Sequence, residues 1–439
     1  MIDRKEAAEK LNIRLPDSND TAARISSWAH AYEGRPDYLS DIIHTSINLA
    51  YSAAHEMARL VTLEFKSEVQ GALSDLWQNI ISDAPIYTEY ACALGGVMLK
   101  PYYDGSGIVV DYVRADSFFP TAYDSKGHIA GCIFCEQITS GSRYYTRLEY
   151  HRYEGGEYVV SNEAFVSDTS TRIGNAVPLG NIPEWAGIAP EVRFTGVRTP
   201  LFAYFKIPGV NIGDASCPMG EPIFARATDI FEKADEQFCR LLWEASATEP
   251  AVFADVTVLR PDDKKKQSKL SQMSRRLFKL LDLNDDSLIK EYAPAIRDAS
   301  QINILNTILR RAEFLCGLAY GTFSDVSQTD KTATEIKASK QRSYATVSAI
   351  QQSLKAALVN LLDVLYELCQ MYGIRCGAVP EASFEFDDSL TVDSEAEQKI
   401  IMQEVAAGLV SPVFYLMRRY GVTEEQALKM LPQAVDNEV

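Results

Sequence analysis

The sequence predicts an α+β protein in which helical blocks at both ends of the chain flank a middle segment rich in β-strands. Apolar residues recur at helical spacing over about the first 90 residues. Short runs of Val, Ile, Tyr and Phe separated by glycines then continue to about residue 205. Helical periodicity returns after a stretch containing Pro and Gly at 207–222. The 439 residues are 46% hydrophobic and 23% charged, so the chain can bury a sizeable core.

The N-terminal block is predicted to be helical because Ile25, Trp28 and Tyr32 follow one another at steps of three and four, as do Ile43 and Ile47. From about residue 91 the alternation typical of strands begins. Its clearest unit is residues 144–160, where apolar and polar residues alternate on both sides of a Glu-Gly-Gly-Glu turn. We expect a β-hairpin there.

The second half of the chain is predicted to hold two helices separated by an insert. Residues 223–247 carry one apolar stripe, and Pro250 ends the pattern. Residues 250–298 form a mixed segment whose centre, residues 260–279, has eight Lys or Arg and two Asp, a local charge of +6. Helical spacing resumes over 301–320 and breaks at Gly321.

A polar run at 321–331 precedes a very long predicted helix. The helix opens with Thr332 and Glu335, which have the spacing of a capping box. Its apolar positions keep steps of three and four over about 40 residues, or roughly 60 Å. After it the chain becomes acidic and strand-like near 384–393, and short helices follow to the C-terminus.

The charge balance argues against a protein that grips nucleic acid. The chain has 43 Lys plus Arg against 60 Asp plus Glu, a net charge of −17. Binding to a duplex draws its free energy mainly from cations that neutralise phosphates. We therefore do not expect stable duplex binding over a broad surface.

The eight cysteines are too dispersed for a disulfide scaffold, and we expect buried free thiols in a reducing cytosol. Residues 3–6 are charged, so no secretory signal is expected at the start of the chain. The most apolar long stretch, residues 356–372, contains four polar or charged residues, so no membrane-spanning segment is expected.

Motifs for catalysis, cofactors and metals are largely missing. The five histidines lie within the first 151 residues, where surface or core roles are expected, and His55-Glu56 lacks the second histidine of a zinc-protease motif. Cys132 and Cys135 have CxxC spacing without a second ligand pair. No P-loop occurs. Three carboxylates, Asp387, Asp388 and Asp393, could hold a divalent cation, although a solvated acidic edge is the simpler interpretation. We predict no catalytic residue, no metal site and no cofactor.

The order of these segments resembles the portal proteins of tailed bacteriophages, in particular those of long-tailed phages and prophages of Gram-positive bacteria. Six short motifs carry the resemblance: WAHAYEG at 28–34, ALGGVMLKP at 93–101, ADSFFP at 115–120, TRLEYH at 146–151, PLF at 200–202 and KTATEI at 331–336. Each is short, but their order and spacing extend over most of the chain.

The resemblance implies a ring, usually of twelve subunits, at one capsid vertex, through which double-stranded DNA is packaged and later ejected. It implies a wing at 1–217 (helices at 1–90, β-rich part at 91–217), stem helices at 218–249 and 299–320, and an α/β clip at 250–298. A tunnel loop at 321–331, a long wing-to-crown helix at 332–382 and a small helical crown at 383–439 complete the plan.

By position, the tunnel-loop residues expected to face the DNA channel are Ser324, Asp325, Gln328, Asp330 and Lys331. The basic clip residues expected to dock a terminase or connector are Lys264, Lys265, Lys266, Lys269, Arg275 and Arg276. A solvated loop without a partner is an equally weighted interpretation of the basic cluster. For Lys331, a place at the start of the long helix without any contact to DNA is the simpler interpretation.

The implied partners are other copies of the chain, DNA passing without sequence specificity, a separate terminase motor, a major capsid or scaffold protein and a head-completion adaptor. The implied location is the virion, after assembly in the bacterial cytoplasm. Two other functions stay open at this point: a metal-dependent cytosolic hydrolase using the 387, 388 and 393 carboxylates, and a virion ring adaptor that does not conduct DNA.

Overall fold

A computed structural model of the protein describes most of the first 250 residues and selected segments after them. The described residues are 2–16, 19–214, 217–249, 251–255, 278–281, 289–292, 297–325, 333–376, 380–386, 402–405, 407, 411–420 and 427. The chain divides into two compact units. The larger comprises 1–63 with 67–384, and the smaller comprises 64–66 with 385–439.

The first 95 residues are mainly helical, as predicted. The elements are α1 (Arg4–Lys10), α2 (Asn19–Tyr32), α3 (Leu49–Thr62), β1 (Lys66–Val69), α4 (Ser74–Ser82) and α5 (Ala84–Leu94). Helix α3 packs on α5 through a buried stripe that includes Ala50, Ala54, Met57 and Val61. These residues stand three and four apart, so they share one face of the helix.

A three-stranded antiparallel sheet follows α5 directly. Its order is β10 (Ala203–Lys206), β2 (Gly96–Tyr103), β3 (Ile108–Arg114). The turn from α5 into β2 requires Gly95, which has a φ of +87°. A Cβ at Gly95 would overlap the Gly220 carbonyl, and one at Gly220 would overlap the Gly95 carbonyl. The two glycines therefore let the irregular stretch before α6 lie against the end of α5.

The second sheet of the β-rich region has six strands. They are β4 (Phe118–Tyr123), β5 (Ile129–Ser140), β6 (Arg143–Glu154), β7 (Glu157–Ser167), β8 (Asn175–Val177) and β9 (Glu191–Phe194), with a short 3₁₀ helix at Leu179–Asn181. Strands β4 to β8 pair in sequence order, and β9 pairs with β7. The predicted hairpin is confirmed, because Glu154 pairs with Glu157 across Gly155 and Gly156, whose φ values are +63° and +87°.

Helix α1 covers part of this sheet. Ile2 and Ala7 are buried in one cluster with Phe119, Ile133 and Leu148 of β4, β5 and β6. The side chain of Asp3 caps the helix by accepting from the Lys5 N–H. The N-terminal segment thus contributes directly to the core of the β-rich region.

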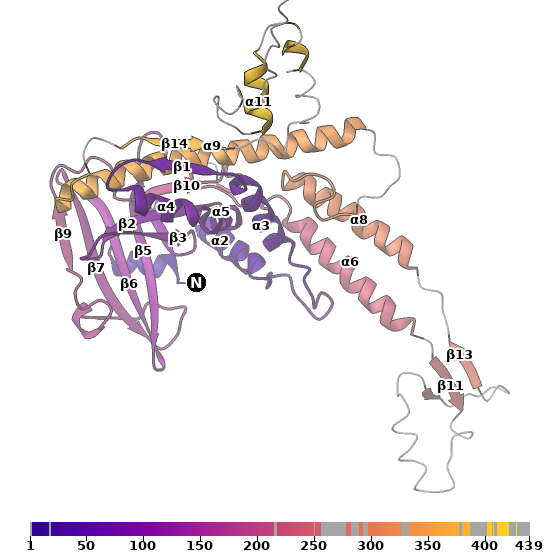
Figure 1. Ribbon diagram of the computed structural model, residues 1–439. Helices are drawn as coiled ribbons and strands as arrows, with labels where there is room; N and C mark the ends of the chain where they lie inside the picture. The colour runs from indigo at the N-terminus through magenta and orange to yellow at the C-terminus, as the bar shows by residue number, and fades with distance from the viewer. Residues whose placement is uncertain are drawn as a thin grey trace, which may run out of the picture. The chain divides into compact units, whose positions relative to one another are not determined.

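Two helices and three strands follow the sheets. Helix α6 (Thr228–Ala247) packs on α8 (Asp298–Leu315), and between them in sequence lie β11 (Ala251–Asp255), β12 (Phe278–Leu281) and β13 (Ile289–Tyr292). Strand β11 pairs with β12 in parallel and with β13 antiparallel. Figure 1 shows α6 and α8 side by side, with β11 and β13 near the ends of the two helices. Both helices are shorter than predicted, because residues 223–227 form turns and α8 ends before Gly317.

The long helix is confirmed as α9 (Ala333–Tyr372), 40 residues in length. Its buried stripe includes Ile350, Leu354, Leu358, Leu361 and Leu365. Hydrogen bonds join it to two other parts of the larger unit: Ser353 Oγ donates to the Lys206 carbonyl of β10, and Gln351 Nε2 donates to the Val61 carbonyl of α3. Figure 1 shows α9 in orange running past β10 and the top of the larger sheet.

Beyond α9 the structure describes less of the chain. Strand β14 (Ala382–Glu385) pairs with β1, and Ser67 Oγ donates to the Ser383 carbonyl. In the smaller unit, the rings of Phe65 and Phe386 stack with centroids 4.7 Å apart, and α11 spans Pro412–Tyr420. The capping box predicted at 332–335 begins outside the described residues.

The expectation of eight free thiols is wrong for one pair, because Cys369 and Cys376 form a disulfide. Helix α9 ends at Tyr372, and Gly373, with a φ of +69°, turns the chain back so that Ile374 donates to the Cys369 carbonyl. The spacing of the cysteines in the sequence does not show that the chain reverses after the helix and brings Cys376 back to Cys369. The other six cysteines are free, and all but Cys135 are buried.

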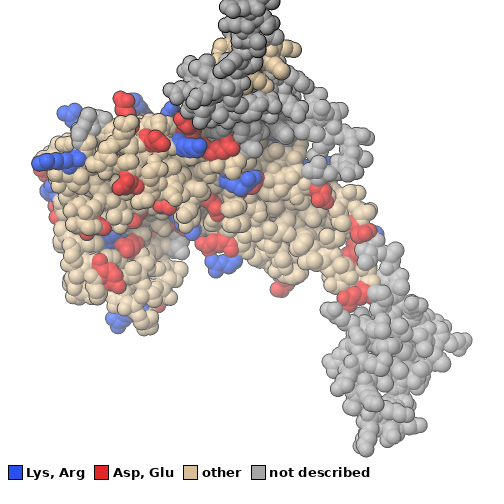
Figure 2. All heavy atoms as spheres, in the orientation of Figure 1, with Lys and Arg blue, Asp and Glu red and all other residues tan. Residues whose placement is uncertain are grey.

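Charged side chains are interspersed in sign on the face of the molecule drawn in Figure 2. Many are paired locally, as in Glu56 with Arg59 on α3 and Glu236 with Arg240 on α6. Exposed pairs of this kind contribute about 0.5 kcal/mol or less. These pairs contribute little to the stability of the fold. The net charge of −17 therefore matters mainly for the long-range electrostatic potential around the protein.

Candidate functional site

The structure describes two of the residues predicted to face the channel. Ser324 is 5% exposed, and Asp325 is exposed. Gln328, Asp330 and Lys331 lie outside the described residues, as do the six basic residues at 264–276 and the carboxylates at 387, 388 and 393. The described part of this region is therefore the base of the 321–331 segment.

A buried carboxylate holds this base. Glu313 of α8 is fully buried, and its Oε1 accepts from the N–H groups of Gly321, Phe323 and Ser324 at 3.1, 2.6 and 2.8 Å. The Ser324 hydroxyl lies 3.0 Å from Oε2. Backbone N–H groups that donate to a carboxylate form charge-assisted hydrogen bonds. Glu313 therefore fixes the path of the chain from 321 to 324.

The end of α8 is shaped by a Schellman motif. The Leu318 N–H donates to the Glu313 carbonyl and the Gly317 N–H to the Phe314 carbonyl, with Gly317 at a φ of +70°. A Cβ on Gly317 would overlap the side chain of Thr346 in α9. The helix end and α9 thus approach as closely as glycine allows.

Helix α9 also contacts this base through a cation–π arrangement. The Arg342 guanidinium lies 4.3 Å from the ring centroid of Phe314 and 5.3 Å from that of Tyr320. Asn306 pairs with the backbone and side chain of Asp325, so the segment folds back along α8 up to residue 325. These contacts fix the base of the segment up to residue 325.

A polar network joins α6 to α8. Glu244 accepts from Arg297 Nε at 2.9 Å and from Gln301 Nε2 at 2.8 Å, and Gln237 Nε2 donates to Gln301. The hydrogen bond from Arg297 lowers the pKa of the Glu244 carboxyl. In the first half of α6, Asp235 accepts from the Tyr38 hydroxyl and the Ile47 N–H. Helix α6 is thereby tied both to α8 and to the N-terminal block.

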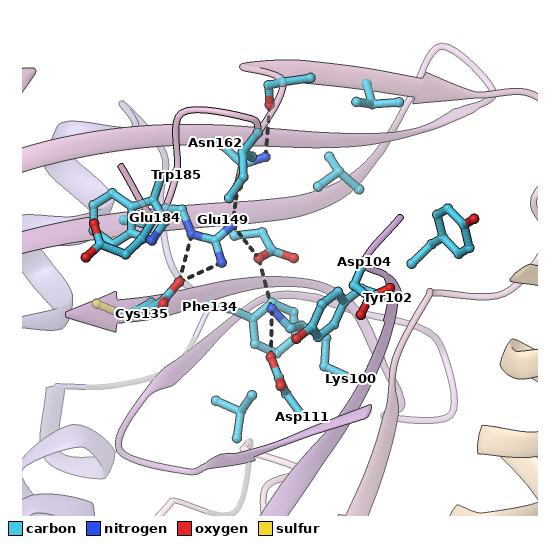
Figure 3. A pocket seen from close by; sticks show the side chains of 18 of the residues that line it. Lys100, Tyr102, Asp104, Asp111, Phe134, Cys135, Glu149, Asn162, Glu184 and Trp185 are labelled. Carbon is cyan, nitrogen blue, oxygen red and sulfur yellow. Dashed lines mark hydrogen bonds and ion pairs between the residues drawn. The ribbon is translucent and has the colours of Figure 1, made fainter. Parts of the chain in front are cut away.

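A cavity of about 1040 Å³ lies in the β-rich region and contains a charge network. Figure 3 shows Lys100 of β2 reaching Glu149 of β6, with Asp111 of β3 on its other side. Lys100 Nζ is 2.9 Å from Glu149 Oε2 and 3.8 Å from Asp111 Oδ2. Arg147 Nη1 is 3.2 Å from the same Glu149 oxygen. We call this cavity, with Lys100, Asp111, Arg147 and Glu149, the charged pocket.

A chain of hydrogen bonds sets the protonation of the buried histidine beside it. His151 Nε2 lies 2.7 Å from Glu149 Oε1, and because a carboxylate only accepts, Nε2 carries the proton and donates to it. In the neutral ring Nδ1 then accepts from the Tyr158 hydroxyl at 2.8 Å, and that hydroxyl accepts from the Leu201 N–H at 3.0 Å. Burial lowers the pKa of His151, against the pull of Glu149, and keeps the ring neutral.

Glu149 is the centre of the network. Burial alone would raise the pKa of its carboxyl, but Lys100, the His151 hydrogen bond and Arg147 hold the pKa well below its ordinary value of 4.5. Its side chain is 12% exposed, and those of Lys100 and Arg147 are 7% and 13% exposed. Each charge thus depends on the others for compensation.

We expect Glu149→Gln to lower the free energy of unfolding at pH 7 by about 3 kcal/mol, since it leaves two buried cations without their shared partner. The control Glu154→Gln, which breaks a pair whose carboxylate is 53% exposed, should change it by about 0.5 kcal/mol or less. Urea unfolding monitored by circular dichroism measures both. Equal losses of unfolding free energy in the two variants would contradict the conclusion that Glu149 compensates two buried cations.

The pH dependence has the same origin. His151 and Glu149 both have folded-state pKa values below their ordinary 6.5 and 4.5, so the unfolded chain binds more protons as the pH falls through these values. Their stabilisation is present at neutral pH and is lost first below 6.5 and then below 4.5. The free energy of unfolding of the wild type should therefore fall as the pH is lowered from 7 to about 4, as urea unfolding at each pH measures. A free energy of unfolding that rises or stays constant over this range would contradict this sign.

Sequence reasoning did not single out Glu313 or the charged pocket. In the sequence, Glu313 looks like any polar residue of a helix. Its hydrogen-bond partners lie in the loop after the helix, so helical spacing does not reveal them. The pocket combines residues from β2, β3, β5 and β6, and only a known pairing register brings them together. The histidine expectation is confirmed: His30, His55 and His128 are exposed or half-buried beside carboxylates, and His151 is a core residue.

The residues that the structure describes bear on two other functions, metal binding and membrane insertion. No group of three or more His, Cys, Asp or Glu side chains in that part of the chain is arranged to hold a metal ion. Within the same residues, no helix combines the length and apolar character needed to cross a bilayer.

Comparisons with known proteins identify the chain. The family described as "Phage portal protein, SPP1 Gp6-like" matches residues 83–437. Proteins of this family are structural components of the virion and are not enzymes. The chain belongs to the SPP1 Gp6-like family of phage portal proteins.

Two further comparisons were made. The search of curated proteins found no match. Among solved structures, the chain is similar to one from the neck of a native GTA particle, computed with C12 symmetry. The identity is 12% and the TM-score 0.41, over 91% of this chain and 98% of that chain.

Proposed function

We propose that the chain assembles into a closed ring of about twelve subunits at one capsid vertex and that double-stranded DNA passes through the axis of the ring. A separate terminase motor would package the DNA, which would later leave by the same channel. The ring would contact the major capsid or scaffold protein on one side and a head-completion adaptor toward the tail. Assembly would take place in the bacterial cytoplasm. The family match over residues 83–437 is the observation that carries this proposal.

In the proposed ring, each part of the portal plan takes a range of the chain. We assign the wing to 1–217, the stem to 218–249 and 299–320, which contain α6 and α8, the clip to 250–298, and the crown to 383–439. Residues 321–331 would be the tunnel loop, held at its base by Glu313. Helix α9 would lead from the wing to the crown.

The charge of the chain suits a conduit. Twelve copies at −17 each carry about −200 in total, and a wall of this sign repels phosphate. DNA could therefore slide without adhering to the ring. Lys331 of the tunnel loop would make brief contacts with phosphates of the duplex, which salt screens within about 8 Å.

Exposed apolar side chains on the two stem helices support assembly with further copies of the chain. Trp243 of α6 is 68% exposed, Ile304 of α8 is 49% exposed, and Leu242 and Ile302 are each about 40% exposed. Neighbours in a closed ring would cover such side chains, with roughly 25 cal/mol of stabilisation per Å² buried.

Electron microscopy of the purified full-length protein, together with native mass measurement, tests the proposal. We expect closed rings with a central channel wide enough for a duplex. Rings whose bore is too narrow for DNA would favour the non-conducting adaptor. A protein that stays monomeric under all conditions, including in the presence of capsid and scaffold proteins, would contradict the ring.

A further inference from the structure

We propose that the charged pocket is a docking site for an arginine- or lysine-bearing peptide segment of another virion protein, a partner class that rests on the proposed function. The pocket lies within one subunit, between strands of the two sheets and the end of α9. Its volume is about 1040 Å³, and Figure 3 shows charged and aromatic side chains that line it.

The accessible charge of the pocket is negative. Its two central cations are largely consumed, since Lys100 and Arg147 are nearly buried and both pair with Glu149. The carboxylates on their outer sides are more open: the side chains of Asp111 and Glu136 are each 47% exposed. Asp104 and Glu184 also line the cavity and are exposed. An entering ligand therefore meets carboxylates first.

Asp111 carries an incompletely balanced negative charge. Burial raises the pKa of its carboxyl, Lys100 at 3.8 Å lowers it, and the neighbouring Glu149 and Glu136 carboxylates raise it again. A cationic side chain placed beside Asp111 would supply the missing compensation. A small anion, in contrast, would face these carboxylates without a free cation of the central network to bind it.

Aromatic rings line the same side of the cavity. Tyr103, the last residue of β2, stacks on Tyr372 at the end of α9, and their ring centroids are 4.5 Å apart. Tyr372 is 45% exposed. Tyr102 is 37% exposed and already has Lys100 Nζ at 5.6 Å from its ring. Guanidinium and ammonium groups bind over such rings, and carboxylates beside them add direct pairing.

One lining residue points to a peptide as the carrier of the cation. Trp185 is only 2% exposed, and its indole N–H has no acceptor. A buried donor without a partner costs about 1–3 kcal/mol. The indole nitrogen has almost no accessible surface, so a backbone carbonyl of the ligand would satisfy it only once the side chains that cover it move apart. Arg114 Nε, also at this cavity, lacks an acceptor as well. A free amine or guanidinium has donors only, whereas a peptide offers both the cation and the carbonyls.

The test is a titration of the full-length protein with a dye-labelled, capped Gly-Arg-Gly-Arg-Gly peptide, followed by fluorescence anisotropy at low salt. The same peptide with Glu in place of Arg is the probe for charge. We expect saturable binding of the Arg peptide, with a Kd below about 1 mM, and none of the Glu peptide. Equal binding of both peptides, or of neither, overturns the proposal.

Two variants separate the pocket from the overall acidity of the chain. Asp111→Asn removes a lining carboxylate and should weaken binding about fivefold, the most that a partly exposed pair supports. Glu163→Gln removes an exposed carboxylate of β7 outside the cavity and should leave binding unchanged. Equal weakening in both variants would show attraction to net charge alone and overturns the proposal.

Because the pocket belongs to one subunit, the titration gives a result for rings and monomers alike. Rings that fail to bind the Arg peptide, although separated monomers bind it, would assign the pocket to a neighbouring subunit and overturn the proposed partner. Absence of rings in the microscope would contradict the proposed function without altering the measured peptide affinity. The two failures are therefore distinguishable.

Discussion

Trp243→Glu should prevent ring assembly while leaving each subunit folded. The indole is 68% exposed on α6 of the single subunit, and in the proposed ring it lies between neighbours. Covering such an indole stabilises one interface by roughly 2 kcal/mol. A carboxylate at that position loses this contribution and adds the cost of desolvating a charge. Because closure repeats the contact at every interface, the effect on the assembled fraction is large.

Native mass measurement and electron microscopy detect the loss, and circular dichroism verifies that the subunit is folded. Trp243→Phe is the matched control, since it keeps an apolar aromatic side chain at the same position and should still assemble. Normal rings from Trp243→Glu would show that this face of α6 does not form the subunit contact. Loss of rings in both variants would show that the subunit contact requires the indole of Trp243 and that another apolar ring cannot replace it.

Glu313→Ala should release the base of the 321–331 segment without dismantling α8. The substitution leaves the N–H groups of Gly321, Phe323 and Ser324 without the carboxylate that accepts from them. Three lost charge-assisted hydrogen bonds at roughly 1 kcal/mol each correspond to about 150-fold faster amide exchange in this stretch. In the proposed channel, a loosened base would lower the amount of DNA packaged or retained.

Hydrogen exchange followed by mass spectrometry reports on peptides covering 317–325, and a packaging assay reports on function. Glu313→Gln is the control, because its amide oxygen can still accept from the backbone and Ser324 Oγ can accept from its amide group. Unchanged exchange in Glu313→Ala would remove the anchoring role. A packaging defect of the same size in Glu313→Gln would show that charge, and not only hydrogen bonding, matters here.

Ser324 also refines how the tunnel loop should be tested. Its hydroxyl and N–H both bond to Glu313, so a deletion that begins at 324 would damage the anchor along with the loop. A deletion of 326–330 leaves Ser324 and Asp325 in place. It is the cleaner way to ask whether residues 328 and 330 act on DNA.

Periodic patterns determined most of the helices and the central hairpin. The stripe from Ile350 to Leu365 is visible as steps of three and four, and it predicted α9 because helix periodicity is a local property of the chain. The same holds for the alternation around Gly155 and Gly156, whose positive φ values the turn requires. The portal family, too, could be inferred from the order of short motifs before any coordinates were considered.

Helix ends were less predictable. The pattern over 301–320 extends past the true end of α8, since Leu318 is buried by a Schellman turn and continues the apolar spacing without continuing the helix. The Cys369–Cys376 disulfide has the same cause, because a glycine in the left-handed region reverses the chain at Gly373. The spacing of apolar residues identifies a regular helix. It does not show at which residue the helix ends or in which direction the chain continues.

By itself, then, the sequence determined the fold class, the long helix, the acidic character and the family of this protein, because each depends on composition or on near neighbours along the chain. Only the tertiary structure decided that Glu313 anchors a loop and that Lys100, Arg147 and His151 converge on Glu149. These groups are brought together by strand register and helix packing. A buried charge has a defined role only once its partners in three dimensions are known.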